Sequence, residues 1–110
     1  MEEIKDILQI FAKQVRQILG SSLVKTIVYG SYARGDYREN SDVDVMILTR
    51  LPEDEIKKYE NLIYDAAFEI QMRYFVDISV IIKNLEQYEY WLETVPFYRN
   101  VQKEGVMIDG

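Results

Sequence analysis

The chain has 110 residues, a length that predicts a single domain over residues 1–110 with one hydrophobic core. Its 19 acidic and 13 basic residues give a formal net charge of −6, which argues against a nucleic-acid partner, because nucleic-acid binding requires a basic patch. The chain has no cysteine, no histidine and no apolar run of membrane-spanning length, so we expect a cytoplasmic protein without disulfides, softer metals or a membrane partner.

The first half of the chain predicts a long helix followed by two strands. Hydrophobic residues at helical spacing indicate the helix, and a run of β-branched residues indicates the first strand. The expected elements are a helix from about residue 3 to Gly20, a strand over Leu23–Tyr29, a turn at Gly30 and Ser31 with a short helix through Arg34, a polar loop over 36–41 and a strand over Asp42–Leu48.

The second half opens with a helix-start signal, a proline followed by three acidic residues. The expected elements are a helix from Pro52 to about residue 72, a strand over Phe75–Ile82, a helix from its cap at Asn84 through Trp91, a helical turn over 97–104 ended by Gly105, and a short strand over Val106–Ile108. This alternation predicts an α/β fold, with a small mixed β-sheet and helices packed mostly on one face.

The segment from residue 30 to residue 44 combines a Gly-Ser turn with two aspartates separated by one residue. In a strand, residues i and i+2 point to the same face, so the carboxylates of Asp42 and Asp44 should project side by side. Two like charges held that close repel unless a cation lies between them, and Mg²⁺ suits such oxygen ligands. An Asp-x-Asp pair alone is more typical of a solvated strand edge. The preceding Gly-Ser turn favours a site for a nucleoside triphosphate and a divalent metal.

The fuller pattern reads Gly30-Ser31-x-Ala33-Arg34-Gly35, followed by Ser41-Asp42-x-Asp44. It resembles the motif of the polymerase-β-like nucleotidyltransferase superfamily and, in this longer form, that of its smallest branch, the minimal nucleotidyltransferases. The resemblance spans nearly the whole chain. It implies a nucleotidyltransferase fold, ATP as the substrate and two Mg²⁺ ions as cofactors.

Asp77 interrupts an apolar run, where a buried carboxylate is costly unless something pairs with it. The residues alone leave three alternatives: a hydrogen-bonded buried carboxylate, an exposed edge residue, or a third acid that faces the same cleft as Asp42 and Asp44. The resembled family places a third carboxylate in this strand, and Asp77 matches that position. We therefore predict that Asp77 faces the cleft.

In the mechanism that the resemblance implies, three carboxylates hold the metal ions. Asp42 and Asp44 would bind two Mg²⁺ ions, and Asp77 would share one of them and act as a base toward the acceptor hydroxyl. This is transfer chemistry that depends on positioning and charge stabilisation, so it requires neither histidine nor cysteine.

Residues of the turn would bind the triphosphate. The backbone of Gly30 and the hydroxyl of Ser31 would donate to the β- and γ-phosphates. Arg34 matches the motif of the small branch and is a further candidate for a phosphate contact. Ser41 is expected only to fix the aspartates through a loop-to-strand hydrogen bond.

The residues do not identify the acceptor. Minimal nucleotidyltransferases of this size pair as antitoxins with a small helical HEPN ribonuclease toxin, and the resemblance implies transfer of AMP from ATP to a tyrosine of that toxin, which inactivates it. The acidic charge suits a basic protein partner. Two alternatives stay open: AMP transfer to another protein or a small molecule, and a non-enzymatic antitoxin that masks its partner sterically.

Overall fold

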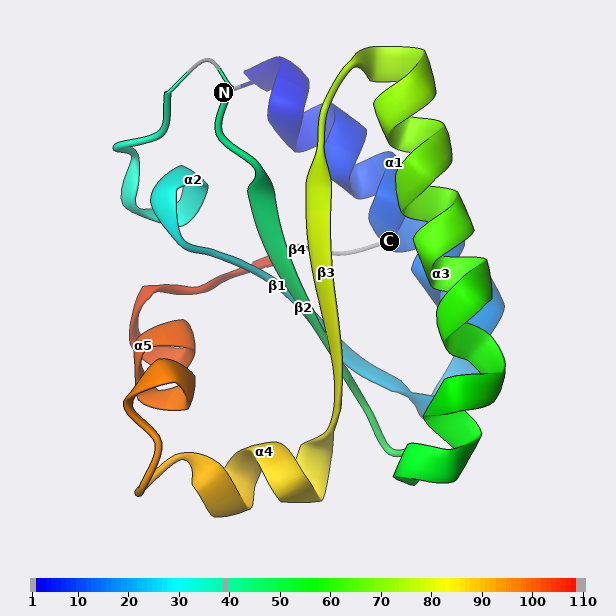
Figure 1. The fold of residues 1–110 in the computed structure, drawn as a ribbon, viewed down its shortest axis with the longest axis vertical. Helices are drawn as coiled ribbons and strands as arrows, with labels where there is room; N and C mark the ends of the chain where they lie inside the picture. Colours follow the sequence, from blue (N-terminus) through cyan, green and yellow to red (C-terminus); the bar gives the residue numbers. More distant parts are fainter. Residues whose placement is uncertain (1, 39, 109–110) are drawn as a thin grey trace.

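The computed structural model describes residues 2–38 and 40–108 (Figure 1). Residue 39 of the predicted loop and residues 1, 109 and 110 of the predicted domain lie outside the described residues. The helices are α1 (Glu2–Leu19), the 3₁₀ turn η1 (Gly20–Ser22), α2 (Ser31–Arg34), α3 (Glu53–Tyr74), α4 (Leu85–Trp91) and α5 (Pro96–Glu104), and the strands are β1 (Leu23–Tyr29), β2 (Val43–Thr49), β3 (Ile78–Asn84) and β4 (Val106–Ile108). Within this part of the chain, no helix has the length and hydropathy to cross a membrane.

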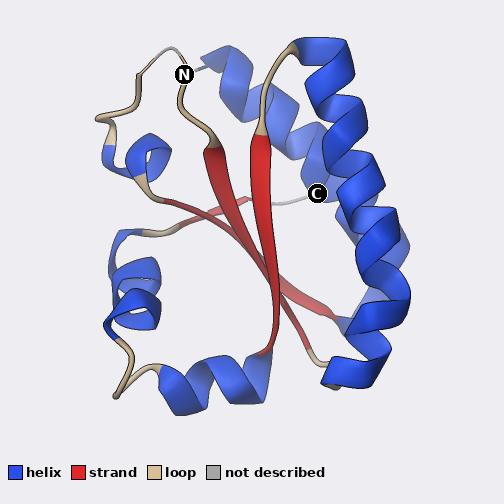
Figure 2. Ribbon diagram, viewed as in Figure 1, coloured by secondary structure: helices blue, strands red, loops and turns tan. Residues whose placement is uncertain are grey.

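The four strands form one mixed sheet in the order β3-β2-β1-β4. β2 pairs parallel with β3 and antiparallel with β1, and β4 pairs antiparallel with β1. The two long helices, α1 and α3, pack together on one face of the sheet, and the short helices α4 and α5 lie on the other side (Figures 1 and 2). The predicted α/β fold with a small mixed sheet is confirmed.

Alternation along β2 divides the hydrophobic core into two parts. Val43 and Val45 belong to the core that the sheet forms with α1 and α3, whereas Met46 and Leu48 belong to a second core with residues of α4 and α5. Asp44 lies in the same alternating row as Met46 and Leu48. The fold therefore directs Asp44 to the sheet face that the short helices cover.

The predicted start of the third strand is wrong. α3 continues through Tyr74, and the N–H of Phe75 still donates to the carbonyl of Gln71 at 2.9 Å, so residues up to 75 belong to the helix end rather than to a strand. β3 then begins at Ile78, and β2 begins at Val43 rather than at Asp42. The other expected elements lie within two residues of their predicted bounds. As a consequence, Asp42 and Asp77 each stand directly before a strand.

Candidate functional site

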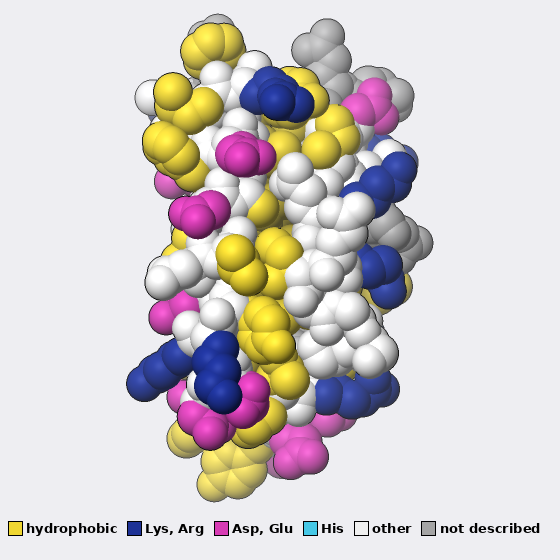
Figure 3. Space-filling model, turned by 90° about the vertical axis from the view of Figure 1, so that its right-hand side faces the viewer, with side chains coloured by type: hydrophobic (Ala, Val, Ile, Leu, Met, Phe, Trp, Pro, Cys, Tyr) yellow, Lys and Arg dark blue, Asp and Glu magenta, His cyan; other side chains and the backbone are white. Residues whose placement is uncertain are grey.

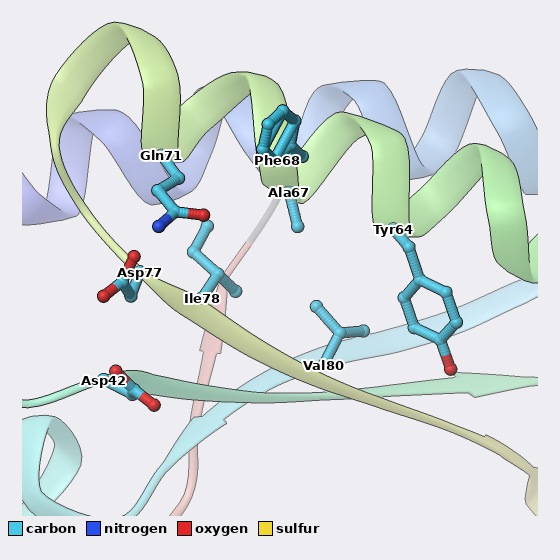
Figure 4. Close-up of a pocket in the computed structure, with 8 residues that line it drawn as sticks. All are labelled: Asp42, Tyr64, Ala67, Phe68, Gln71, Asp77, Ile78 and Val80. Carbon is cyan, nitrogen blue, oxygen red and sulfur yellow. The ribbon is translucent and has the colours of Figure 1, made fainter.

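The parallel pairing of β2 and β3 brings Asp42 and Asp77 together. Val43 is paired with Ile78 in the sheet, and the N–H of Val43 donates to the carbonyl of Asp77 at 2.8 Å. Asp42 and Asp77, which directly precede this pair, therefore lie side by side at the N-terminal ends of β2 and β3. Figure 4 shows their side chains at the same end of a cavity between α3 and β3.

This first cavity has a volume of about 380 Å³. One wall consists of α3 residues and the other of β3 residues, and Asp42 and Asp77 close one end (Figure 4). Its lining comprises Asp42, Tyr64, Ala67, Phe68, Gln71, Asp77, Ile78 and Val80.

Asp77 is exposed and lies outside β3, so the alternative of a buried, hydrogen-bonded carboxylate within the strand does not apply. The physical reason is the longer α3, which leaves Asp77 in the connection before β3. Its position beside Asp42 agrees with the predicted cleft. Asp44, however, lines a different cavity, so the structure places the three carboxylates around the sheet edge rather than in one cleft.

The second cavity lies on the side of the sheet that carries α2 and α5, and its volume is about 370 Å³. The predicted turn residues and Asp44 form one side of it, and residues of α5 form the other. Its lining comprises Tyr29, Gly30, Ser31, Arg34, Asp44, Phe97, Asn100, Val101 and Glu104. The structure thus brings together Gly30, Ser31, Arg34 and Asp44, as the motif predicted.

Gly30 is required at the floor of this cavity. Its φ of 74° lies in the left-handed region that favours glycine, and a Cβ added there would collide with the Asp44 carboxylate and lie 3.3 Å from its Cγ. After Gly30 the chain enters the single turn of α2, in which the N–H of Arg34 donates to the Gly30 carbonyl at 3.0 Å. The absent side chain therefore leaves the backbone of the turn directly against the Asp44 carboxylate.

The electrostatics of Asp44 agree with the predicted repulsion between the two motif carboxylates. Burial raises the pKa of Asp44, the nearby charge of Asp42 raises it further, and the positive charge of Arg34 partly opposes both effects. Burial, together with the charge of Asp44, also raises the pKa of the neighbouring Tyr29 to about 12. The Tyr29 phenol is therefore neutral at physiological pH.

Arg34 is held at the mouth of the second cavity by two carboxylates. Its Nε lies 3.2 Å from Asp36 Oδ2, and its Nη1 lies 3.2 Å from Glu104 Oε2, on α5. All three side chains are at least a third exposed, and exposed ion pairs contribute little to stability. The guanidinium is thus positioned at the cavity by contacts that an incoming anion can replace at small cost.

Ser41 makes two local hydrogen bonds, both to Arg38 of the same loop. Its Oγ accepts from the N–H of Arg38 at 2.9 Å, and its own N–H donates to the Arg38 carbonyl at 3.0 Å. This reciprocal pair closes the loop directly before Asp42. Both bonds lie within the loop and neither reaches β2, so the loop-to-strand hydrogen bond predicted for Ser41 is not seen.

The donor chemistry at the sheet edge fits Mg²⁺. Asp42, Asp44 and Asp77 offer only oxygen ligands, and within residues 2–38 and 40–108 none of the three forms an ion pair with a basic side chain. No three acidic side chains in these ranges converge closely enough to hold a metal ion by themselves. Since Mg²⁺ normally takes one or two carboxylates and completes its shell with water and phosphate oxygens, the arrangement suits an ion bound together with a nucleotide.

The far walls of both cavities were not predicted from the sequence. Phe97, Asn100 and Glu104 of α5 face the second cavity, and Tyr64 and Phe68 of α3 face the first. Their spacings of three, four and seven residues are those of one helix face, a signal present in the sequence. What the sequence did not contain is which strand ends these helix faces would lie against.

Three comparisons with known proteins agree with this geometry. Residues 8–106 match the sequence family of the nucleotidyltransferase domain. A Methanocaldococcus jannaschii protein named "Putative protein adenylyltransferase MJ0141" is 42% identical over 80 residues, which cover 73% of this chain and 79% of that protein. The protein adenylyltransferase MntA of Thermococcus cleftensis is 44% identical over 48 residues, or 43% of this chain and 46% of MntA. Among solved structures, a toxin-antitoxin crystallised with AMP-PNP shares the fold, with a TM-score of 0.62 and 20% identity over 96% of this chain and 73% of that one.

Proposed function

Because this chain belongs to the nucleotidyltransferase domain family, we propose that it is a protein adenylyltransferase that acts as an antitoxin: it transfers AMP from ATP to a tyrosine of a helical HEPN-type ribonuclease toxin. The single observation that carries this proposal is the position of the motif aspartates between two cavities, one of which contains the Gly-Ser turn and the other Asp77. The names of the relatives, which are protein adenylyltransferases, support a protein as the acceptor.

ATP would bind in the second cavity. The backbone of Gly30 and the hydroxyl of Ser31 donate to the β- and γ-phosphates, and Arg34 exchanges Glu104 for a phosphate oxygen. On the opposite wall, the ring of Phe97 packs edge-to-face against Tyr29, with ring centroids 5.6 Å apart, and offers an apolar surface to the nucleoside.

The acceptor tyrosine would enter the first cavity, where its hydroxyl approaches Asp42 and Asp77. Asp77, exposed at the cavity end, accepts the proton of that hydroxyl. The tyrosine oxygen forms a bond to the α-phosphorus, the bond between that phosphorus and the α,β-bridging oxygen breaks, and pyrophosphate leaves. Mg²⁺ ions held by Asp42 and Asp44, with Asp77 as a further ligand, would supply charge neutralisation for the triphosphate and the departing pyrophosphate.

The experiment that tests this function mixes the purified protein with labelled ATP, Mg²⁺ and the protein encoded by its neighbouring gene, as the candidate toxin. We expect AMP on a toxin tyrosine, located by peptide mass spectrometry, and no transfer by the double variant Asp42→Asn/Asp44→Asn. ATP binding measured by calorimetry should be clear with Mg²⁺ and weak in excess chelator. Equal ATP affinity with Mg²⁺ and in excess chelator would contradict metal-dependent binding. Label on a small molecule instead of the toxin would show that the acceptor is not a protein.

A further inference from the structure

A row of exposed hydrophobic side chains follows α3 on the side away from the core. Tyr64, Phe68 and Met72 recur every four residues, so they lie on one face of the helix, and they are 45%, 56% and 64% exposed. Phe75, directly after the helix, is 90% exposed and continues the row. We refer to these four residues as the α3 stripe. Single exposed hydrophobic residues are common, but a contiguous row of four large ones is typical of an interaction site.

Phe75 gives independent support that the α3 stripe serves binding. It has a φ of 59°, a left-handed conformation that costs a residue with a side chain about 1–2 kcal/mol. Its ring gains almost no packing in return, because it is nearly fully exposed. A strained backbone that presents an aromatic ring to solvent is a feature that clusters at binding sites.

The α3 stripe leads into the first cavity. Tyr64 and Phe68 belong both to the stripe and to the cavity wall, and Asp42 and Asp77 lie at one end of the same cavity (Figure 4). The opposite wall is β3, which is an edge strand of the described sheet. The groove is therefore open along its length and continuous with the carboxylates at its end.

The charged side chains that line this groove are acidic. Its lining contains no lysine or arginine, and Asp42 and Asp77 contribute two carboxylates. The residues that directly follow Tyr64, Phe68 and Met72 are all exposed, and they are Asp65, Glu69 and Arg73. The two acidic ones therefore accompany the stripe residues that line the cavity, and the basic one follows Met72, which does not line it. Figure 3, which views the side of the molecule formed by α3, shows hydrophobic side chains from top to bottom, with acidic and basic side chains among them. Such a surface is complementary to a partner segment that is both apolar and basic.

We propose that the α3 stripe and the first cavity form the docking surface for the acceptor protein. The occupant is a protein segment that carries the acceptor hydroxyl between apolar side chains, which pack on Tyr64 and Phe68, and basic side chains, which face Asp65 and Glu69. This inference rests on the proposed function, in which ATP fills the second cavity and leaves the first one to the acceptor. The inference assigns to the α3 stripe the selection of the acceptor protein, a role separate from the transfer reaction itself.

The test compares the double variant Phe68→Ser/Met72→Ser with a matched control, Tyr90→Ser/Met107→Ser. The control residues are also hydrophobic and exposed, by 72% and 59%, but belong to α4 and β4. The probe is the toxin from the neighbouring gene. Its association with each protein is measured by calorimetry without nucleotide, its modification is measured by mass with ATP and Mg²⁺, and the oligomeric state of each protein is measured by light scattering.

For Phe68→Ser/Met72→Ser we expect toxin association at least tenfold weaker than wild type and a KM for the toxin raised by a similar factor, with kcat and ATP affinity within about twofold. The control variant should match wild type. The inference is overturned if the stripe variant binds and modifies the toxin normally, if the control loses as much, if wild type does not bind the toxin, or if the stripe variant converts a wild-type dimer to a monomer. If wild type binds the toxin but adds no AMP, the proposed function fails while the binding measurement still decides the docking surface.

Discussion

Gly30 and Asp44 share a space that admits only one side chain. The Asp44 carboxylate occupies the volume in which a Cβ on residue 30 would lie, and the backbone there has a positive φ. Gly35, five residues later, also has a positive φ of 85°, but a Cβ on it would meet nothing within 4 Å. An alanine at either position would strain the backbone, but only an alanine at residue 30 would also obstruct the site.

We expect Gly30→Ala and Gly35→Ala each to lower the free energy of unfolding by about 1 kcal/mol or more, because alanine is strained at positive φ. Only Gly30→Ala should also lose Mg²⁺-dependent ATP binding, since its methyl group displaces the Asp44 carboxylate. Urea unfolding and calorimetry measure the two effects. Normal ATP affinity in a folded Gly30→Ala protein would contradict the place given to this turn.

Asp77 provides a second test at the level of one residue. Its carboxylate is exposed, and the hydrogen bond that ties residue 77 to Val43 uses only its backbone carbonyl. Asp77→Asn should therefore change the free energy of unfolding by no more than about 0.5 kcal/mol, while AMP transfer falls by orders of magnitude. Thermal unfolding and transfer rates measured on the same preparation check this. An unstable but active variant would show that Asp77 is structural.

The raised pKa of Asp44 predicts how stability depends on pH. In the unfolded chain an aspartate titrates near pH 3.9, and in the folded protein burial and the charge of Asp42 raise the pKa of Asp44 above that value. Between the two values the unfolded chain loses its proton first, so the contribution of Asp44 to the free energy of unfolding falls as pH rises. Urea unfolding from pH 3 to pH 7 should show Asp44→Asn gaining stability relative to wild type through this window and no further above it. If the difference in the free energy of unfolding between Asp44→Asn and wild type did not change with pH, the pKa of Asp44 would not be raised by folding.

At the level of elements, the packing of α3 and α5 distributes the motif residues between two separate cavities. α3 walls the cavity of Asp42 and Asp77, and α5 walls that of Asp44 and the Gly-Ser turn. The end of α3 also sets where Asp77 stands, because the helix runs through Tyr74 and the strand begins only at Ile78.

Phe75 ends α3 at a measurable cost in stability. Phe75→Gly should raise the free energy of unfolding by about 1 kcal/mol, because glycine adopts the left-handed conformation without strain and the lost ring is 90% exposed. Phe75→Ala removes the same ring but keeps the strain, so it should not be stabilised in this way. Equal stability of the two variants in urea would argue against strain at this helix end.

The sequence predicted the elements well where local signals decide them. The strand over Leu23–Tyr29 and the helix cap at Asn84 rest on residues within a few positions, and Asn84 Oδ1 does accept from the N–H of Gln87 at 3.1 Å. The start of β3 failed, because the apolar run from Phe75 reads as a strand while the helix-ending conformation of Phe75 leaves no signal in its neighbours.

Only the part of the candidate site that depends on residues close together in sequence was predictable. The Gly-Ser turn and the Asp-x-Asp pair are recognisable from spacing alone, so Gly30, Ser31, Asp42 and Asp44 could be proposed as site residues from the sequence. The contact between Arg34 and Glu104 joins residues 70 positions apart, and the division of the carboxylates between two cavities depends on where α3 and α5 pack. Local sequence contains neither fact.

On the scale of the whole molecule, the proposed function places the nucleotide and the acceptor in two different cavities, with the motif aspartates between them. The family membership confirms the nucleotidyltransferase class predicted from the motif, and it gives chemical meaning to two cavities that meet at the motif aspartates. The two cavities that contain motif residues have volumes of about 380 and 370 Å³, and an exposed apolar row on α3 leads into the first of them. This is the arrangement expected when the acceptor is a macromolecule that supplies its own binding surface.

The most direct test of the central claim, catalytic AMP transfer, is the ratio of protein to toxin needed to silence the toxin. The toxin is incubated with Mg²⁺ and increasing amounts of this protein, with or without ATP, and its ribonuclease activity is then measured. Catalytic transfer predicts complete loss of ribonuclease activity at amounts far below one molecule per toxin, only when ATP is present and never with Asp42→Asn/Asp44→Asn. Loss that appears only at equimolar amounts, equally without ATP and with the double variant, would contradict it and establish steric masking instead.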